Sequence, residues 1–170
     1  MTMLRYLLTG LVFACLAGAA QAADVVYLVR HAEKIADGTS DPKLTDEGRA
    51  RVCNLQGFFA GKGLTHVLSS DYHRTRDTAT PLAKSLGLKV EEYDPKHQVV
   101  LAMMLKNKPG TYLIVGHSNT LPELSLVLGG DDIGPWGENE YDQFFELRFA
   151  GGEVTTTKHQ SDAQCPVLAE

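Results

Sequence analysis

A regular alternation of short apolar runs with longer amphipathic segments is the feature that most constrains this chain. The runs predicted as strands are residues 24–29, 66–69, 88–93 and 111–115. Each is followed by a segment with helical spacing: one that begins at the Thr45 N-cap and ends before Gly61, then residues 74–86, 98–106 and 120–128. Four strand–helix units in a row predict an α/β protein with a mostly parallel sheet.

The last part of the expected domain has a different pattern. Residues 144–149 and 153–157 flank Gly151-Gly152, which predicts an antiparallel hairpin. We therefore expect a three-layer α/β/α sandwich whose mostly parallel sheet ends in this hairpin. The chain has 170 residues, about the length of one domain, and contains no internal repeat and no long Pro/Gly linker.

The first 22 residues differ from the rest. A basic Arg5 precedes an apolar run from Tyr6 to Ala19, and Ala20-Gln21-Ala22 has the small-x-small pattern of a cleavage site. This order predicts a secretory signal peptide at residues 1–22, followed by a single domain at 23–170. The run is shorter than the ~20 residues that span a bilayer. We therefore expect a periplasmic or secreted protein with no stable membrane insertion after signal cleavage.

The charge balance limits the classes of partner that this protein can bind. Sixteen lysines and arginines against twenty-one acidic residues give a net charge of −5, which becomes −6 when the signal peptide leaves with one arginine and no acid. This balance argues against a nucleic-acid partner and against broad binding to anionic membranes. It is compatible with a small cationic pocket inside an acidic protein.

Cysteine usage leaves two possibilities open. Cys53 and Cys165 belong to the expected mature domain, and in an oxidising compartment they can form one disulfide between the C-terminal tail and a helix. The alternative is a buried Cys53 and an unpaired Cys165. Cys15 leaves with the signal peptide, and the bulky Phe13 disfavours it as a lipidated residue. No C-x-x-C pair occurs, so a zinc knuckle or a thioredoxin-type site is excluded.

Basic and histidine side chains follow three of the predicted strands. They lie in residues 30–34 (RHAEK), 69–76 (SSDYHRTR) and 116–120 (GHSNT). Ligands of an open parallel sheet bind at the carboxyl ends of its strands, so we expect these segments to meet. A cluster of cations in an acidic protein predicts that the ligand is a compact anion. Phosphate is the anion that best fits the planar guanidinium group of arginine. The candidates are Arg30, His31, Arg74 and His117, whereas His66, His97 and His159 are interpreted as packed or solvated.

These motifs resemble a known family. Arg30-His31 after the first strand, Ser70-x-x-x-Arg74 after the second and Gly116-His117 after the fourth are similar to the histidine phosphatase superfamily, also called phosphoglycerate mutase-like. The resemblance runs from about residue 25 to residue 154. The absence of large insertions resembles the small bacterial branch. The resemblance implies the phosphoglycerate mutase-like form of the α/β sandwich.

The resemblance also implies a mechanism, hydrolysis of phosphomonoesters through a phosphohistidine without a metal or other cofactor. His31 would be the nucleophile, and His117 would stabilise the charge of the transition state. The arginines would bind the phosphoryl oxygens bidentately, which supplies the cationic charge. The substrate-binding residues expected are Arg30, Arg74, Ser118 and Asn119.

The sequence offers several candidates for the acid that protonates the leaving group. Mutase members of the family have a glutamate after the third strand, and this chain has Glu91, Glu92 and Asp94 there without the mutase pattern. Asp94 is the favoured acid because it lies at a strand end, and Glu33 is the alternative. Without the mutase pattern, and with export expected, a hydrolase is favoured over a mutase.

Two other functions remain as alternatives. A non-catalytic phosphate-binding or signalling protein of the same fold would keep the pocket and lack turnover. A serine hydrolase would use Ser118, which has Thr120 where the nucleophile elbow has glycine, together with Asp131 or Asp132 and then His159.

The substrate is left open among a phosphorylated small molecule, an envelope sugar and a phosphoprotein. The loop at residues 129–142 is expected near the mouth of the site. In that loop Trp136 and Tyr141 either contact substrate or pack against the domain.

Overall fold

The computed structural model describes residues 23–165, so the predicted signal peptide lies outside the described residues. The elements, in chain order, are β1 (Val25–Arg30), α1 (Asp46–Phe59), β2 (His66–Ser69), α2 (His73–Ser85), β3 (Val90–Glu92), α3 (Gln98–Asn107), β4 (Thr111–Gly116), α4 (Thr120–Leu128), β5 (Gln143–Ala150) and β6 (Glu153–Gln160). The four predicted strand–helix units and the hairpin are confirmed, with bounds that differ by a few residues. Within the described range no helix is long and apolar enough to cross a membrane.

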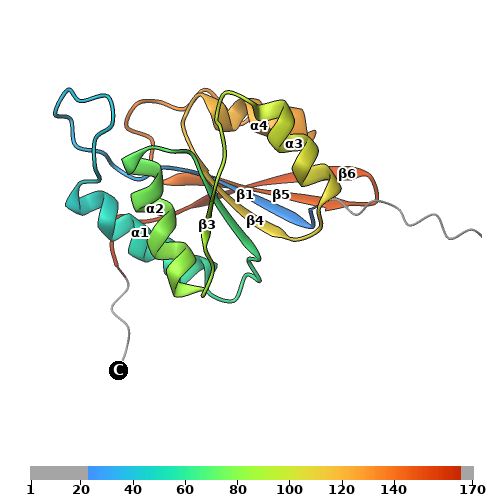
Figure 1. Cartoon of the computed structure of the whole chain (residues 1–170), viewed down its shortest axis with the longest axis horizontal. Coiled ribbons are helices and arrows are strands. Elements are labelled where there is room, and N and C mark those ends of the chain that lie inside the picture. Colours follow the sequence, from blue (N-terminus) through green and yellow to red (C-terminus); the bar gives the residue numbers. More distant parts are fainter. Residues whose placement is uncertain (1–22, 166–170) are drawn as a thin grey trace, which may run out of the picture.

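The six strands form one sheet in the order β3-β2-β4-β1-β5-β6. The first four strands in this order are parallel, and β5 is antiparallel to both β1 and β6. The sheet is therefore mostly parallel and ends in an antiparallel hairpin, as predicted. In Figure 1 the helices lie on both sides of this sheet.

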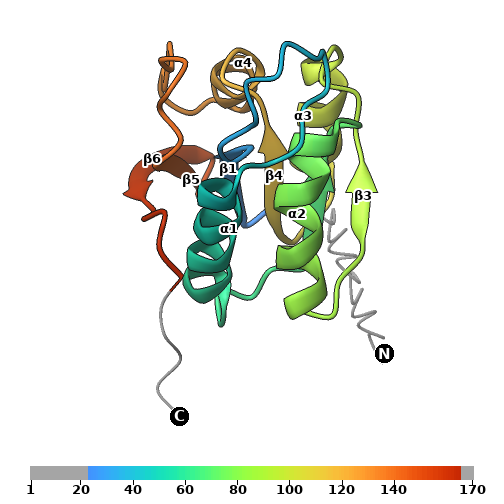
Figure 2. The same ribbon diagram turned by 90° about the vertical axis from the view of Figure 1, so that its left-hand side faces the viewer.

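Each face of the sheet carries its own hydrophobic core. Successive side chains of a strand point to opposite faces, and in β4 Leu113 and Val115 belong to one core while Tyr112 and Ile114 belong to the other. Helices α1 and α2 cover the first core, and α3 and α4 cover the second (Figures 1 and 2). This arrangement confirms the three-layer α/β/α sandwich.

The start of α1 follows its sequence signal. The Thr45 hydroxyl accepts a hydrogen bond from the Gly48 amide at 3.0 Å, and Asp46 and Glu47 lie in the first turn of the helix. The cap pairs one of the free amides of the helix terminus, and the acids interact favourably with its dipole. The N-cap was therefore predictable from local sequence alone.

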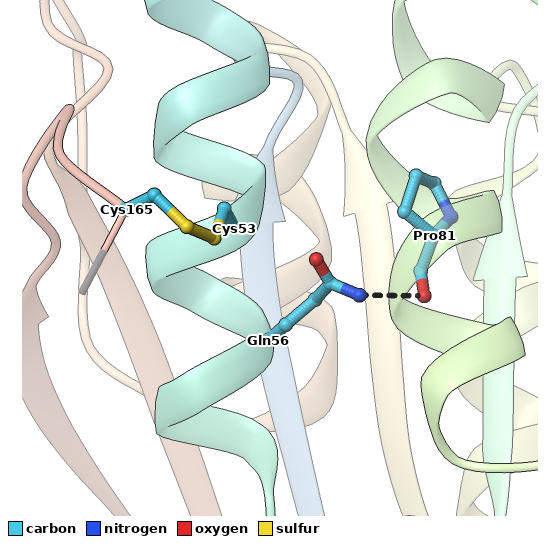
Figure 3. Close-up of a disulfide and its surroundings, with 4 residues drawn as sticks. All are labelled: Cys53, Gln56, Pro81 and Cys165. Carbon is cyan, nitrogen blue, oxygen red and sulfur yellow. Dashed lines mark hydrogen bonds between the residues drawn. A yellow bond between two sulfur atoms is a disulfide. The ribbon is translucent and has the colours of Figure 1, made fainter. Parts of the chain in front are cut away.

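A disulfide joins Cys53 on α1 to Cys165 in the C-terminal tail, with 5.1 Å between their Cα atoms (Figure 3). Of the two possibilities left open by the sequence, the structure has the paired one. One turn further along α1, the Gln56 amide donates to the Pro81 carbonyl of α2 at 3.1 Å, which links the two helices. The tail therefore lies against the helical layer formed by α1 and α2.

Candidate active site

The candidate site lies where β1, β4 and β2 end side by side. Arg30 pairs with Gly116 and Ser69 pairs with Val115, so the segments after these strands begin at the same level. The loop after β1, drawn in blue to cyan, and the orange loop before β5 lie at this end of the sheet in Figure 1. The ring centroids of His31 and His117 are 5.6 Å apart.

Close packing shapes the end of β4 and requires glycine there. A Cβ atom on Gly116 would lie 2.6 Å from the Tyr93 hydroxyl and 2.8 Å from a methyl group of Leu121. The Gly116 carbonyl in turn accepts a hydrogen bond from the His31 amide at 2.9 Å. Glycine at this position therefore leaves room for Tyr93 and Leu121 to pack against the end of β4.

The His31 side chain is buried and has a defined tautomer. Nδ1 donates to the Ala32 carbonyl at 2.8 Å, which leaves a lone pair on Nε2. Burial, reinforced by the positive charges of Arg30 and Arg74, lowers the pKa of His31 to about 3. The ring is therefore neutral at pH 7, with one nitrogen available as a nucleophile.

His117 is held by a chain of hydroxyl groups. Thr75 donates to the Ser70 carbonyl at 2.8 Å, and the Ser70 hydroxyl donates to the Thr75 hydroxyl at 3.1 Å. The same Ser70 oxygen is 2.9 Å from Nε2 of His117, so it accepts from that nitrogen. Burial, reinforced by Arg74 and Arg30, lowers the pKa of His117 to about 4. Both histidines are therefore neutral in the folded protein.

Arg30 departs from the expected bidentate contact with a phosphoryl group. Its Nη atoms donate to the carbonyls of Gly137, Glu138 and Glu140 at 2.8 to 3.0 Å, and its guanidinium lies 4.2 Å from the ring centroid of Tyr141. Within the described residues its buried Nε has no hydrogen-bond partner. In this arrangement Arg30 fixes the loop before β5.

Arg74 lies in the first turn of α2 and contacts the loop after β1. Its Nη1 is 3.5 Å from the Asp41 carboxylate and donates to the Ser40 carbonyl at 3.3 Å. Its guanidinium lies 4.5 Å from the ring centroid of Tyr72, which itself packs edge-on against His117 at 5.0 Å. These contacts orient the guanidinium beside the histidine pair.

A pocket of about 250 Å³ opens beside His117; it is lined by Tyr72, Arg74, Pro95, Lys96, His117, Asn119 and Thr120. Asn119 therefore lies at the predicted site, while the neighbouring Ser118 is half-buried in the same turn. A larger cavity of about 750 Å³ lies at the opposite edge of the sheet, next to the β5–β6 turn. The smaller pocket is the candidate site because the buried His117 and the half-buried Arg74 line it.

The two candidate acids lie in other surroundings. The Glu33 carboxylate is buried in an ion pair with Arg51, with N–O distances of 2.6 to 3.1 Å. Asp94 is exposed and accepts from the Lys96 amide at 2.9 Å, which lowers the pKa of its carboxyl group, and its other oxygen contacts His97. Within the described residues, neither carboxylate makes a hydrogen bond or an ion pair with His31 or His117.

The residues of the alternative serine hydrolase are not assembled. His159 is 3.2 Å from Glu146 and stacks on Phe144 with 5.1 Å between ring centroids. In the part of the chain that the structure describes, no hydrogen bond joins it to Ser118, and the Asp132 carboxylate accepts from a neighbouring loop amide instead. The geometry gives this alternative no support.

Three residues around the site were not singled out from the sequence, namely Asp41, Tyr72 and Lys96, and Ser70 was named only as part of the family motif. Ser70 and Tyr72 occur in a segment that the strand-end rule had already selected, so that rule could have identified them.

The two aromatic residues in the loop before β5 differ in their surroundings. The ring centroid of Tyr141 lies 5.9 Å from that of His31, whereas Trp136 is buried against Phe145. Among residues 23–165 no group of three His, Cys, Asp or Glu side chains is arranged to bind a metal.

Comparison with known families agrees with this geometry. The profile of the histidine phosphatase superfamily, branch 1, matches residues 26–95, the segment that contains Arg30, His31 and Arg74. The chain is therefore similar to this superfamily over the segment that contains β1 to β3. Proteins named "Probable phosphoglycerate mutase GpmB" from Yersinia pestis and Yersinia pseudotuberculosis are 34% identical to it over 90 residues, which is 49% of this chain. The match spans about two fifths, 41%, of the length of those relatives.

Solved structures of superfamily proteins share the fold. The protein histidine phosphatase SixA, solved with tungstate, has a TM-score of 0.64 at 18% identity, with 82% of this chain and 97% of that chain covered. A mycobacterial glucosyl-3-phosphoglycerate phosphatase has a TM-score of 0.60 at 14% identity, with 83% and 99% covered. At these identities the similarity shows a phosphoglycerate mutase-like fold, and the superfamily includes phosphatases and mutases.

Proposed function

We propose that this protein is a phosphatase that hydrolyses phosphomonoesters through a covalent phosphohistidine on His31. The observation that carries the proposal is the state of that imidazole. Its Nδ1 donates to the Ala32 carbonyl, its Nε2 keeps a lone pair, and burial holds its pKa at about 3. A neutral, oriented imidazole is the nucleophile that this chemistry requires. The match of residues 26–95 to the superfamily profile supports the same activity.

The proposed reaction has two steps. In the first, Nε2 of His31 attacks phosphorus, a P–N bond forms and the P–O bond to the leaving group breaks. Arg74 and the unpaired Nε of Arg30 would bind the phosphoryl oxygens as charge develops. His117 would bind them in the tautomer whose Nε2 accepts from the Ser70 hydroxyl and whose Nδ1 donates. In the second, water attacks phosphorus, the P–N bond breaks, and phosphate leaves while His31 is regenerated. Because the protein supplies the positive charge, we expect turnover without added metal.

The carboxylates near the site bear on the choice of substrate. Glu33 is paired with Arg51, Asp94 accepts from a turn amide, and Asp41 lies beside Arg74. A substrate whose leaving group is stable without prior protonation is therefore favoured. Aryl phosphates meet this condition. A phosphohistidine meets it when its other ring nitrogen carries a proton, because a P–N bond then breaks in place of the P–O bond and neutral imidazole leaves. Of the expected substrates, this ranks a phosphoprotein above a phosphorylated small molecule or an envelope sugar, and the similarity to SixA supports that order.

The same observation supports one alternative, a non-catalytic phosphate-binding protein. Such a protein would use Arg74 and His117 to bind the anion and would not turn over, because no acid completes the reaction. The two functions differ in whether a covalent phosphoenzyme forms.

The deciding experiment measures hydrolysis of p-nitrophenyl phosphate in the presence of EDTA. We expect turnover by the wild type and a loss of roughly 10³-fold or more in His31→Ala, since removal of a nucleophile has effects of that order. His97→Ala is the matched control, because this histidine is exposed and paired with Asp94. Rapid quenching with labelled substrate should trap an acid-labile phosphoprotein in the wild type alone.

Each other outcome has a defined meaning. Saturable phosphate binding without turnover or phosphoenzyme would support the binding protein. Full activity in His31→Ala would overturn the proposed nucleophile.

We also propose export to the periplasm or beyond, with cleavage after Ala22. The three-part pattern of residues 1–22 supports this location, and so does the disulfide, since such bonds persist in oxidising compartments. The intact mass of the protein from a periplasmic extract is expected to equal that of a chain that begins at Ala23. A cytoplasmic protein that begins at Met1 would contradict the proposal.

A further inference from the structure

An apolar surface lies on α3 and α4, away from the histidine pair. Four of the five large hydrophobic side chains that are exposed among the described residues belong to these two helices, which pack against each other. They are Val99, Val100 and Met103 on α3 and Leu126 on α4, with Val100 64% and Met103 61% exposed; we call them the α3–α4 face. The fifth, Ile35, lies in the loop after β1. An exposed apolar cluster of this kind marks an interaction surface.

Lysines lie at both ends of this surface. Lys96 precedes α3, and Lys106 lies in its last turn, where the ammonium group donates to the Val127 carbonyl of α4 at 2.8 Å. An apolar stripe with lysines at its ends is typical of a helix that lies in a membrane interface, because the long side chains keep their charge in the headgroup layer. The exposed Glu123 lies one turn before Leu126, so apolar contact rather than charge is expected to dominate.

The N-terminal segment enters the fold beside the same helix. The Ala23 amide donates to the Leu105 carbonyl in the last turn of α3, and the Asp24 amide donates to the Gly110 carbonyl, both at 2.8 Å. The 22 residues before Ala23 include the apolar run from Tyr6 to Ala19. A membrane-targeting segment is thus joined to the domain at the helix that carries the exposed apolar side chains.

We propose that the α3–α4 face is a lipid-contact surface. Through it, the folded domain binds reversibly to the membrane across which the protein is exported. Pro95 and Lys96, immediately before α3, also line the pocket beside His117. Contact through this face would therefore hold the pocket near phosphate groups at the membrane surface. The lipid contact is independent of the proposed activity. Its place at the export membrane rests on the proposed export, and the access to membrane phosphates rests on the proposed activity.

The test is flotation with vesicles of phosphatidylethanolamine and phosphatidylglycerol. The chain that begins at Ala23 is used, because residues 23–165 contain all the described strands and helices and both cores. We expect the wild type to float with the vesicles. The double variant Val100→Glu/Met103→Glu should lower the partition coefficient roughly tenfold or more, since it places charge in the apolar contact.

Ile35→Glu is the matched control, because it adds the same charge at an exposed hydrophobic residue outside the face. This variant should float like the wild type, and thermal unfolding should show that all variants are folded. Turnover of p-nitrophenyl phosphate should be unchanged in the double variant, so a failure of the proposed function and a failure of lipid contact appear in separate measurements.

Three results would overturn the proposal. The first is a wild type that does not float, and the second is equal loss of flotation in Ile35→Glu. The third is a wild-type dimer in sedimentation that Val100→Glu/Met103→Glu dissociates, without flotation, which would assign the α3–α4 face to a second copy of the chain.

Discussion

His31 and Glu33 are two positions apart in the chain, yet they belong to buried polar clusters of opposite character. Around Glu33 the charges are paired: Arg51 binds the carboxylate and also donates to Ser161 in the tail. Around His31 the pairing is incomplete, because Nε2 keeps its lone pair and Nε of Arg30 has no partner among the described residues. Paired buried groups hold a structure together, whereas groups left available can bind a ligand.

Burial and charge therefore do not by themselves mark a functional residue. Both residues follow β1, and both were candidates from the sequence. What separates them is whether the fold supplies a partner. Arg51 on α1 supplies one to Glu33, and the tail that the Cys53–Cys165 disulfide attaches to α1 supplies another group to Arg51.

Breaking the paired cluster should have the largest effect on stability. Arg51→Ala leaves a buried carboxylate without its partner, so the free energy of unfolding should fall by about 3–5 kcal/mol. Urea unfolding measures this loss. Arg49→Ala is the control on the same helix, since its ion pair with Asp46 is exposed and contributes little. Equal losses in the two variants would show that burial of the Glu33 pair is unimportant.

Removing the disulfide should have the next largest effect. The bond closes a loop between residues 112 positions apart. The double variant Cys53→Ser/Cys165→Ser should therefore lose roughly 4 kcal/mol of unfolding free energy. While the variant remains folded, its kcat/KM should match that of the wild type, because the histidine cluster makes no contact with the bond. Lost activity in the folded variant would show that the two clusters are coupled.

Substitution in the incompletely paired cluster should act on catalysis instead. Arg74→Ala removes a donor for the phosphoryl oxygens, so kcat/KM should fall by about 10²–10³-fold. The matched control is Arg76→Ala, two residues further along α2, whose partner is the exposed Asp71. Steady-state kinetics with p-nitrophenyl phosphate, alongside thermal unfolding, separate the two effects. A similar loss in both variants would argue against a specific role for Arg74.

The pH dependence of stability should be the mildest of these effects. Burial lowers the pKa of His31 from 6.5 to about 3 and that of His117 to about 4. Between these values and 6.5 the unfolded chain binds more protons, so stability should fall as the pH falls through this window. Urea unfolding at several pH values measures the slope. The double variant His31→Asn/His117→Asn should have a shallower slope, and an unchanged slope would contradict neutral buried histidines.

Much of the fold was predictable because its signals are local. The Thr45 cap, the apolar runs and the Gly151-Gly152 turn each depend on neighbouring residues, and the structure has each of them. The rule that ligands bind at the carboxyl ends of parallel strands then selected the segments that meet at the site. Residue types and element order were sufficient for this step.

The partners of the candidate acids were not predictable in the same way. Glu33 is paired with Arg51 of α1, eighteen positions later, and nothing in the spacing of the sequence indicates this pair. The Arg30 side chain likewise contacts carbonyls more than 100 positions away. Because such contacts form only when distant segments pack, they decide which charges remain available.

The sequence by itself therefore determined the α/β/α architecture, the family resemblance and the set of strand-end residues that includes His31, Arg74 and His117. The packed fold was needed to establish three further features. They are the neutral state of the histidines, the disulfide between Cys53 and Cys165, and the hydrogen bonds from Arg30 to carbonyls of the loop before β5. The physical reason is that secondary structure follows from short-range periodicity, whereas pKa values and hydrogen-bond partners depend on burial and on neighbours that the folded chain brings together.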